Sequence, residues 1–248
     1  MLTGDRQSVA ARFASVARQI SARSSQLIMN APSCTKRLSH TRLGREGQLV
    51  NEELTPEQVY TVSFFQAVRD TSAGSADVVA PEVHAWLRPT RVLDIGCGEG
   101  AWLVRFAASG AAVLGLDGSY VDTSRLMIPP TAFRPHDLRE PLPAQVLAWG
   151  ADLVICLEVA EHLPPGRAPS LIEDLTSAAD TVLFSAAVPG QGGYGHINEQ
   201  PHEFWIDLFE RQGFAITRIL QRRFADDERV AWWYRKNLLV ASRVRRTR

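Results

Sequence analysis

Long apolar runs are absent from this sequence of 248 residues. A helix that crosses a bilayer needs roughly 20 consecutive apolar residues. The longest apolar stretches here, such as 153–157 and 182–184, have only the length of a β-strand. The sequence therefore predicts no membrane-spanning helix, and no membrane partner is expected.

Cysteine is also scarce. The three cysteines, Cys34, Cys97 and Cys156, are far apart and odd in number, so no disulfide framework is indicated and a reducing cytoplasm is the expected compartment. Hydrophobic residues make up 45% and charged residues 22% of the chain. Both values are ordinary for a globular protein and exclude a collagenous, coiled-coil or wholly disordered chain. The length fits one α/β domain with extensions.

Lysine occurs only twice, so arginine supplies almost all of the positive charge. Residues 1–50 carry eight basic and two acidic side chains, whereas residues 51–248 carry 19 basic and 25 acidic ones. A basic arm on an acidic body binds an anion or is a solvated extension, and for an arm without a pattern we favour the second. We therefore expect 1–50 to be a basic, partly disordered extension, 51–242 the folded domain, and 243–248 a basic tail.

The basic extension has two parts. Apolar residues at helical spacing among the arginines of 5–29 predict a short amphipathic helix. This pattern is typical of an organellar transit peptide and equally of a plain extension, and both interpretations stay open. Residues 30–50 hold turn formers and few apolar side chains, and predict a linker.

From residue 91 onward, short apolar segments alternate with amphipathic ones. The expected strands cover 91–95, 112–116, 151–157, 181–187, 214–220 and 237–241, and the expected helices cover 101–109, 169–179 and 201–212. Upstream, Thr55-Pro56-Glu57 is typical of a helix N-terminus, and a second helix is expected over 75–87, before Pro89. Strands that alternate with helices of about ten residues predict an α/β fold with a doubly wound parallel sheet.

The most informative motif is Val92-Leu-Asp-Ile-Gly-Cys-Gly-Glu-Gly100, in which a strand runs into a glycine-rich turn. Glycine lets the backbone approach a ligand closely, and the helix that follows offers free N–H groups. Dinucleotide-binding proteins have G-x-G-x-x-G here, with a pyrophosphate on the helix. The spacing in this chain is G-x-G-x-G after Asp94, and a carboxylate at the strand tip favours a cationic ligand. A glycine-rich turn without any ligand is the alternative.

Three further acids follow at regular intervals. Asp117 ends the strand after Asp94, Asp137 lies 20 residues later, and Glu158 lies 21 residues beyond that. An acid about 20 residues after the glycine motif is where a ribose diol is held, because one carboxylate accepts from both hydroxyls. Since the carboxyl ends of parallel strands meet at one edge of a sheet, we expect the four acids to line one crevice there.

These segments resemble the motifs of class I S-adenosylmethionine-dependent methyltransferases, in a bacterial methyltransferase-domain branch. The resemblance is carried by the segments Asp94–Gly100, Asp117, His136-Asp-Leu138, Glu158-Val-Ala-Glu-His-Leu163, Ser185–Gly193, His196–Gln200 and Trp233–Leu238. It implies a Rossmann-like, mostly parallel seven-stranded sheet whose last strand is antiparallel, and S-adenosyl-L-methionine as cofactor. The chemistry agrees, because methyl transfer is a displacement in which the cofactor brings the reactive group and the protein supplies orientation.

The same resemblance implies nine cofactor-binding residues. They are Gly96, Cys97 and Gly98 at the methionine part, Asp117 at the ribose, Asp137 and Leu138 at the adenine, and Glu158 at the floor of the pocket, together with Asp94 and Gly118.

Two histidines, His162 and His196, are the expected catalytic residues on the acceptor side. An oxygen or nitrogen acceptor must lose a proton, and histidine titrates near neutral pH. The segment Glu161-His-Leu163 fits a structural turn of this fold equally well. His196 lies in the glycine-rich stretch 190–199, which is typical of a substrate lid or of an ordinary surface loop.

A divalent cation is the second interpretation of this region, because carboxylates and imidazoles are its usual ligands. The residues of the right type are Glu158, Glu161, His162 and His196. Similar spacing occurs in metal-dependent enzymes that methylate the 2′-hydroxyl at RNA 3′ ends, but Glu-x-x-Glu-His is also common in metal-free small-molecule methyltransferases. We therefore predict no metal ligands from the sequence.

Two aromatic groups remain, Phe204-Trp205 and Trp232-Trp-Tyr234. Such residues clasp a flat acceptor or fill the core, and we favour the core.

The function expected from these features is that of a cytoplasmic S-adenosylmethionine-dependent methyltransferase that acts in biosynthesis. The expected partner is a small-molecule acceptor, methylated at an oxygen of a sugar or secondary metabolite. A metal-dependent RNA 2′-O-methyltransferase and a non-catalytic cofactor-binding protein are the alternatives. The acidic body lacks the basic groove that RNA binding needs, so a nucleic-acid partner is not expected.

Overall fold

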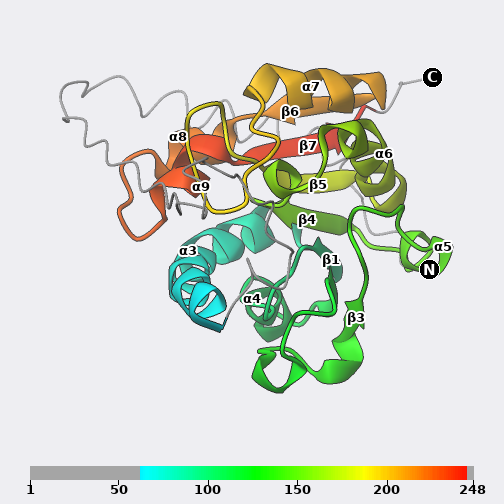
Figure 1. The fold of residues 1–248 in the computed structure, drawn as a ribbon, viewed down its shortest axis with the longest axis vertical. Coiled ribbons are helices and arrows are strands. Elements are labelled where there is room, and N and C mark those ends of the chain that lie inside the picture. Colours follow the sequence, from blue (N-terminus) through cyan, green and yellow to red (C-terminus); the bar gives the residue numbers. More distant parts are fainter. Residues whose placement is uncertain (1–61, 245–248) are drawn as a thin grey trace, which may run out of the picture.

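The computed structural model describes residues 62–244, with side chains from residue 71 onward (Figure 1). The helix expected over 5–29, the linker over 30–50 and the helix start at 55–57 lie outside the described residues. Among the described residues, no helix is both long and apolar enough to cross a membrane.

The described part of the chain forms a seven-stranded sheet in the order β3-β2-β1-β4-β5-β7-β6. The strands are β1 (Arg91–Ile95), β2 (Ala112–Asp117), β3 (Phe133–Pro135), β4 (Leu153–Leu157), β5 (Thr181–Ser185), β6 (Phe214–Thr217) and β7 (Leu239–Arg243). The first five pair in parallel, and β7 is antiparallel to both β5 and β6. This confirms the predicted α/β class, the doubly wound sheet and the antiparallel last strand.

Helices cover both faces of the sheet (Figure 1). They are α3 (Val62–Leu87), α4 (Leu103–Ala108), α5 (Ala144–Leu147), α6 (Ala168–Ala178), α7 (His202–Arg211), α8 (Ile219–Phe224) and α9 (Trp232–Asn237). Side chains of α5, α6 and α7 pack in one hydrophobic cluster, and those of α3, α4, α8 and α9 pack in a second cluster on the opposite face. Alternate residues of the central strands enter the two clusters, as a strand buried on both faces requires.

The chain order places a switch point between β1 and β4. From β1 the chain runs to β2 and β3 on one side, and it then returns to β4 on the other side of β1. Ligands of open α/β sheets bind outside the carboxyl ends of the strands at such a point. The crevice predicted from the four acids therefore lies where the topology expects it.

The N-terminal helices differ from the prediction, because α3 is one continuous helix through residue 87. The second helix expected over 75–87 is the C-terminal part of α3, and Gly74 lies inside the helix. The Ser75 hydroxyl donates to the Thr71 carbonyl oxygen at 2.9 Å and accepts from the Ala231 amide at 3.0 Å, so this part of the helix is held against the segment before α9. Its buried face follows helical spacing at Ala76, Val79, Ala80 and Val83. Packing thus outweighs the weak helix propensity of a single glycine.

The C-terminal segment differs as well. The strand expected over 214–220 ends at Thr217, and helix α8 begins at Ile219. Helix α9 occupies the aromatic segment Trp232-Trp-Tyr234, for which no helix was expected. The short β3 and α5 were not expected. Short apolar runs do not distinguish a strand from a buried helical turn. The strand expected to continue to residue 220 and the unexpected helix α9 both lie in such runs.

Candidate functional site

Two adjoining cavities lie at the carboxyl ends of β1, β2 and β4. The larger has a volume of about 330 Å³ and the smaller a volume of about 120 Å³, and both are lined by Gly96, Asp117 and Glu158. The larger is also lined by Gly118, Tyr120, His136, Asp137, Leu138 and His162. The smaller is also lined by Ser72, Asp94, Cys97, Gly98, Trp102 and Tyr234. The structure therefore brings all nine predicted cofactor residues to this pair of cavities, and their role in binding stays a prediction.

The glycine-rich turn after β1 approaches β4 closely. Gly96 has a φ of +82°, and a Cβ atom at this position would lie 2.2 Å from Cγ2 of Val159. The backbone amides of Gly96 and Cys97 both donate to the Leu116 carbonyl oxygen, which ties the turn to the end of β2. A side chain at position 96 is thus excluded both by the backbone conformation and by lack of space.

We expect Gly96→Ala to lower the free energy of unfolding by about 1–3 kcal/mol more than Gly110→Ala does. Gly110 has a similar φ of +90°, but no atom lies within 4 Å of a Cβ built there. The two variants share the backbone strain, so their difference isolates the overlap with Val159. Urea unfolding followed by tryptophan fluorescence measures both. Equal losses would show that Val159 moves aside freely.

Asp117 connects the two cavities. One carboxylate oxygen accepts from the Gly98 amide at 2.7 Å, and the other accepts from the Gly118 amide and the Tyr120 hydroxyl, both at 2.7 Å. The side chain is buried, at 6% exposure. Burial raises the pKa of Asp117, and these three hydrogen bonds oppose that rise. Because a carboxylate has about four acceptor positions, room for a ligand hydroxyl remains.

Asp94 lies at the smaller cavity as a buried acid. Its side chain is 3% exposed, and it has no hydrogen-bond partner among the residues that the structure describes. Burial, and then the charge of Asp117, raise its pKa well above the ordinary value. A cationic group of a ligand would relieve both effects, because a buried charge is stable only when it is paired. The smaller cavity therefore suits a ligand that carries a positive charge at this end.

Glu158 holds an unusual backbone conformation, with a φ of +55° for a residue that is not glycine. Its Oε1 accepts from the Asn237 amide group and its Oε2 from that of Gln191, each at 3.3 Å. Asn237 also donates to the Gln191 side-chain oxygen at 2.9 Å. Strained residues of this kind persist where the surroundings hold them, and they are frequent at functional sites. Neither Asn237 nor Gln191 was predicted as a site residue, although both lie in segments that carry the resemblance.

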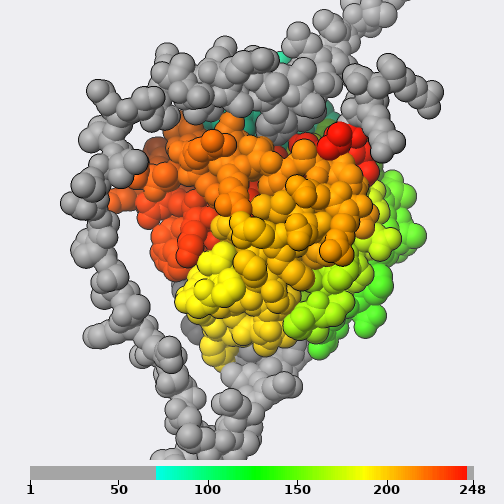
Figure 2. Space-filling model, turned by 90° about the horizontal axis from the view of Figure 1, so that it is seen from above, coloured from blue at the N-terminus to red at the C-terminus, as the bar shows by residue number. Residues whose placement is uncertain are grey.

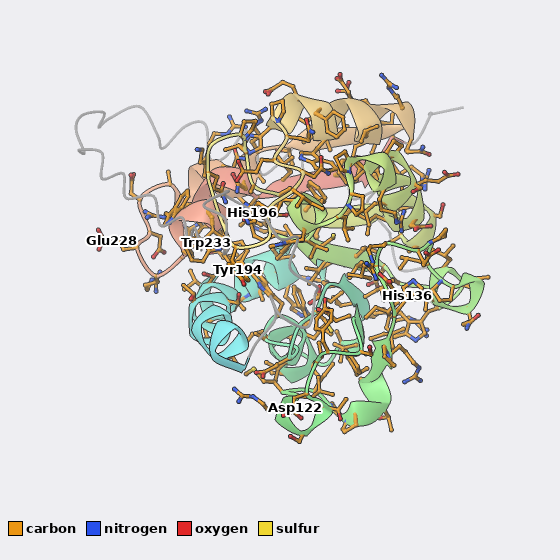
Figure 3. The ribbon with its side chains drawn as sticks, viewed as in Figure 1. Asp122, His136, Tyr194, His196, Glu228 and Trp233 are labelled. Atoms are coloured by element: carbon orange, nitrogen blue, oxygen red, sulfur yellow. The ribbon has the colours of Figure 1, made fainter. Side chains whose placement is uncertain are left out.

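The far end of the larger cavity is formed by the loop after β3. Leu138 is buried there, whereas Asp137 is exposed and binds the Arg139 guanidinium with distances of 2.6 to 3.0 Å. The hydrogen bond from Arg139 lowers the pKa of Asp137. Figure 3 shows His136 in this part of the molecule, well away from His196.

A buried ion pair supports this loop from behind. Nε of Arg167 donates to the Leu138 carbonyl oxygen at 3.1 Å, and a terminal nitrogen donates to the Glu140 carbonyl oxygen at 3.1 Å. The same guanidinium binds Asp174 of α6 at 2.5 Å, and Asp174 accepts from the Leu142 amide at 3.1 Å. The sequence analysis did not identify either residue.

The predicted histidines meet at the other end of the larger cavity. The rings of His162 and His196 are 4.9 Å apart and nearly perpendicular, at 86°. Nδ1 of His162 lies 3.3 Å from the Gly195 carbonyl oxygen, and Nδ1 of His196 lies 2.9 Å from Oε1 of Glu199. Burial, and then His196, lower the pKa of His162 to about 4, so this imidazole is neutral at neutral pH. His162 lines the cavity, whereas His196 stands behind it.

The loop that carries His196 is fixed at both ends of its glycine-rich stretch. The Glu199 carboxylate accepts from the amides of Gly190 and Gly192 at 2.8 and 2.7 Å. The amides of Ile197 and Asn198 donate to the Glu161 carbonyl oxygen at 2.9 and 3.0 Å. In Figure 2 this loop, drawn in yellow, lies at the surface beside α7. Its exposed apolar side chains are Tyr194 (49%) and Ile197 (60%), and its role as a substrate lid stays a prediction.

Of the aromatic residues that the sequence singled out, Tyr234 lines the smaller cavity. Its hydroxyl lies 3.0 Å from the Ser72 hydroxyl, and its ring packs edge-on against Trp102 at 5.3 Å. Burial raises the pKa of Tyr234 to about 12, so the phenol stays neutral. Trp205 is fully buried against Phe184 and belongs to the core.

Three of the four residues considered for a metal come together. One ligand atom from each of Glu161, His162 and His196 lies within 4.8 Å of the other two. Glu158 is not part of this group. The set that was considered and not adopted from the sequence is thus reduced to one carboxylate and two imidazoles.

Comparison with known proteins finds similarity to methyltransferases. Residues 76–187 match a family model described as a methyltransferase domain. The ubiquinone biosynthesis O-methyltransferase of Neisseria meningitidis serogroup C is 31% identical over 145 residues, which cover 54% of this chain and 58% of that protein. The protein of the same name from Aromatoleum aromaticum is 35% identical over 108 residues, which cover 41% and 46%. The chain thus spans about half the length of the curated relatives it matches.

Solved structures share the fold. The magnesium protoporphyrin IX methyltransferase of Synechocystis PCC 6803, crystallised with bound SAH, superposes with a TM-score of 0.53 over 75% of this chain and 89% of its own, at 23% identity. At this identity the likeness concerns the fold alone. It agrees with the seven-stranded sheet and its antiparallel end.

Proposed function

We propose that this chain is a class I S-adenosylmethionine-dependent methyltransferase, and that it transfers a methyl group from that cofactor to an oxygen of a small molecule. The observation that carries the proposal is the pair of adjoining cavities that share Gly96, Asp117 and Glu158. One cavity suits a nucleoside and the other suits a charged amino-acid group, so together they match one elongated ligand with two unlike ends.

The residues present fit the cofactor. The buried carboxyl of Asp94, which has no hydrogen-bond partner in the part of the chain that the structure describes, is suited to the positive charge at the amino-acid end. Asp117 keeps an acceptor position for a ribose hydroxyl beside its own three hydrogen bonds. Leu138 offers an apolar surface to the adenine, with Asp137 at the edge. The cofactor, when bound, supplies a methyl group on a positively charged sulfur.

The acceptor end is assigned to the part of the larger cavity near His162. An acceptor hydroxyl must lose its proton as its oxygen is methylated, and we assign the assistance of this step to the pair His162 and His196. Glu199 holds His196 through Nδ1 and thereby fixes the orientation of its ring. The protein contributes position and proton handling.

An oxygen acceptor is supported by the names of the curated relatives, which are O-methyltransferases. Within that class we propose a sugar or a secondary metabolite. An RNA acceptor has less support, because three acids and one arginine, Arg139, are the charged groups that line the larger cavity. A non-catalytic role is tested directly by incubation with labelled cofactor and a panel of acceptors, with and without a chelator.

Replacement of Asp117 tests the cofactor site. We expect Asp117→Ala to weaken cofactor binding by about 2–3 kcal/mol, roughly 30- to 150-fold in Kd, because it removes a charge-assisted hydrogen bond to the ribose and releases the Gly98 and Gly118 amides. Isothermal titration calorimetry with S-adenosylmethionine measures the change. The matched control is Asp207→Ala, an exposed acid on α7, which should bind as the unchanged protein does. Unchanged affinity of Asp117→Ala would remove this residue from the site.

A further inference from the structure

We propose that Glu161, His162 and His196 form a site for one divalent transition-metal cation at the acceptor end of the larger cavity. One possible ligand atom from each residue lies within 4.8 Å of the other two, and side-chain shifts of about 1 Å would bring all three to the distance of roughly 2 Å at which zinc is bound. The binding of the cation follows from these residues alone, whereas its part in methyl transfer rests on the proposed function.

The carboxyl group of Glu161 is the strongest reason. The side chain is 0% exposed, and its Oε2 has no hydrogen-bond partner among the described residues. Only Oε1 is engaged, by the Ala187 amide at 3.2 Å. A buried carboxylate oxygen without a partner is costly, so the site needs either a cation or a proton there. A proton shared with the neighbouring Glu158 is the alternative, and the experiment below separates the two.

The two imidazoles are held as metal-binding histidines are held. Nδ1 of His196 faces the Glu199 carboxylate at 2.9 Å, and Nδ1 of His162 faces the Gly195 carbonyl oxygen at 3.3 Å. Histidines that bind metals usually donate their other ring N–H to such a carboxylate or carbonyl, which fixes the tautomer and turns Nε2 towards the ion. Glu199 thus has a positioning role, and it acts through His196.

Glycine at position 193 leaves room for the His196 ring. A Cβ atom at Gly193 would lie 2.2 Å from Nε2 of His196. The same loop is fastened beside Glu161 by the amides of Ile197 and Asn198. The three ligands therefore belong to two segments that are already joined, and no ordering of a free loop is needed before a cation binds.

The ligand set selects the class of cation. Two imidazole nitrogens and one carboxylate oxygen suit Zn²⁺ or Co²⁺, whereas Mg²⁺ and Ca²⁺ prefer oxygen ligands. Three protein ligands leave a coordination position open, as in catalytic zinc sites. Under the proposed function, the two imidazoles would then serve as ligands in place of accepting the proton themselves, and the positive charge would favour loss of the proton from the acceptor hydroxyl to water. Glu158, held by Asn237 and Gln191, remains with the cofactor cavities.

The test is zinc binding by the full chain after treatment with a chelator. We expect calorimetry with ZnCl₂ to give one site per chain, and MgCl₂ to give none. His196→Ala and Glu161→Gln should weaken zinc binding at least about 10²-fold, and Glu199→Gln about 10- to 100-fold. Gly193→Ala should weaken it as well, because the added methyl group displaces the His196 ring. Cobalt absorption in the unchanged protein gives a second readout that needs no variant.

The control variant is His84→Gln, which removes a histidine of α3 outside the cluster and should leave zinc affinity unchanged. The proposal is overturned if the unchanged protein binds no zinc, or if His196→Ala and Glu161→Gln bind it as tightly as His84→Gln does. A shared proton between Glu158 and Glu161 would then be the correct account. S-adenosylmethionine binding is measured on the same metal-free protein, so a failure of the metal site leaves the proposed function intact.

Discussion

Alanine in place of His162 should lower the turnover number of methyl transfer about 10²–10⁴-fold, the usual contribution of a group that assists proton transfer. His162 lines the cavity at the acceptor end and is packed against His196, so its loss affects both proton handling and the position of the second ring. Cofactor affinity should stay nearly unchanged, because the cofactor residues lie at other parts of the cavities. Initial rates with labelled cofactor, together with calorimetry, measure the two quantities separately.

The comparison variant for this experiment is His136→Ala. His136 lines the same cavity at the opposite end, next to the loop that carries Asp137 and Leu138. Its loss should raise the KM for the cofactor more than it lowers the turnover number. Full turnover by His162→Ala on the true acceptor would contradict our assignment of the acceptor end.

Methionine in place of Arg167 should lower the free energy of unfolding by about 3–5 kcal/mol, because it leaves Asp174 as a buried charge without its partner. The Arg167 guanidinium also donates hydrogen bonds to the Leu138 and Glu140 carbonyl oxygens, and both oxygens lose this donor in the variant. Urea unfolding at pH 7 measures the loss. A rise in the KM for the cofactor should accompany it, because the loop that bears Leu138 is released.

Two further variants serve as controls for the effect of Arg167→Met. Arg218→Met breaks an exposed ion pair with Glu203 and should cost less than about 1 kcal/mol. The double variant Arg167→Met with Asp174→Leu removes both buried charges and should recover part of the stability that the single variant loses. If Arg167→Met were as stable as Arg218→Met, the ion pair would not support the loop.

The cofactor side of the site was predictable because it follows the chain locally. Asp94, Asp117 and Glu158 each lie at or just after the end of a strand, and the ends of parallel strands meet at one edge of the sheet. Only the strand pattern and the spacing of acids are needed for that inference. The structure accordingly places every predicted cofactor residue at the two cavities.

The residues that hold the site residues in place could not be predicted in this way. Asn237 reaches Glu158 across 79 residues, and Arg167 reaches the Leu138 carbonyl oxygen across 29. Polar residues at such separations have no periodicity that marks them, and their partners are set by tertiary packing. The φ of Glu158 was equally hidden, because glutamate has no preference for the left-handed region. Glu199 lies only three residues from His196, but the loop conformation decides that they meet.

The position of Asp117 between the two cavities has a thermodynamic consequence. One of its oxygens holds Gly98, which lines the smaller cavity, and the other holds Gly118, which lines the larger. A ligand fragment that orders either side therefore lowers the entropic cost of ordering the other, which is a reciprocal coupling free energy between the two halves. A molecule that spans both cavities gains from this coupling, and it also presents its second half at a high effective concentration. Free nucleosides and free amino acids, which fill one half at a time, are thereby weak competitors for the site.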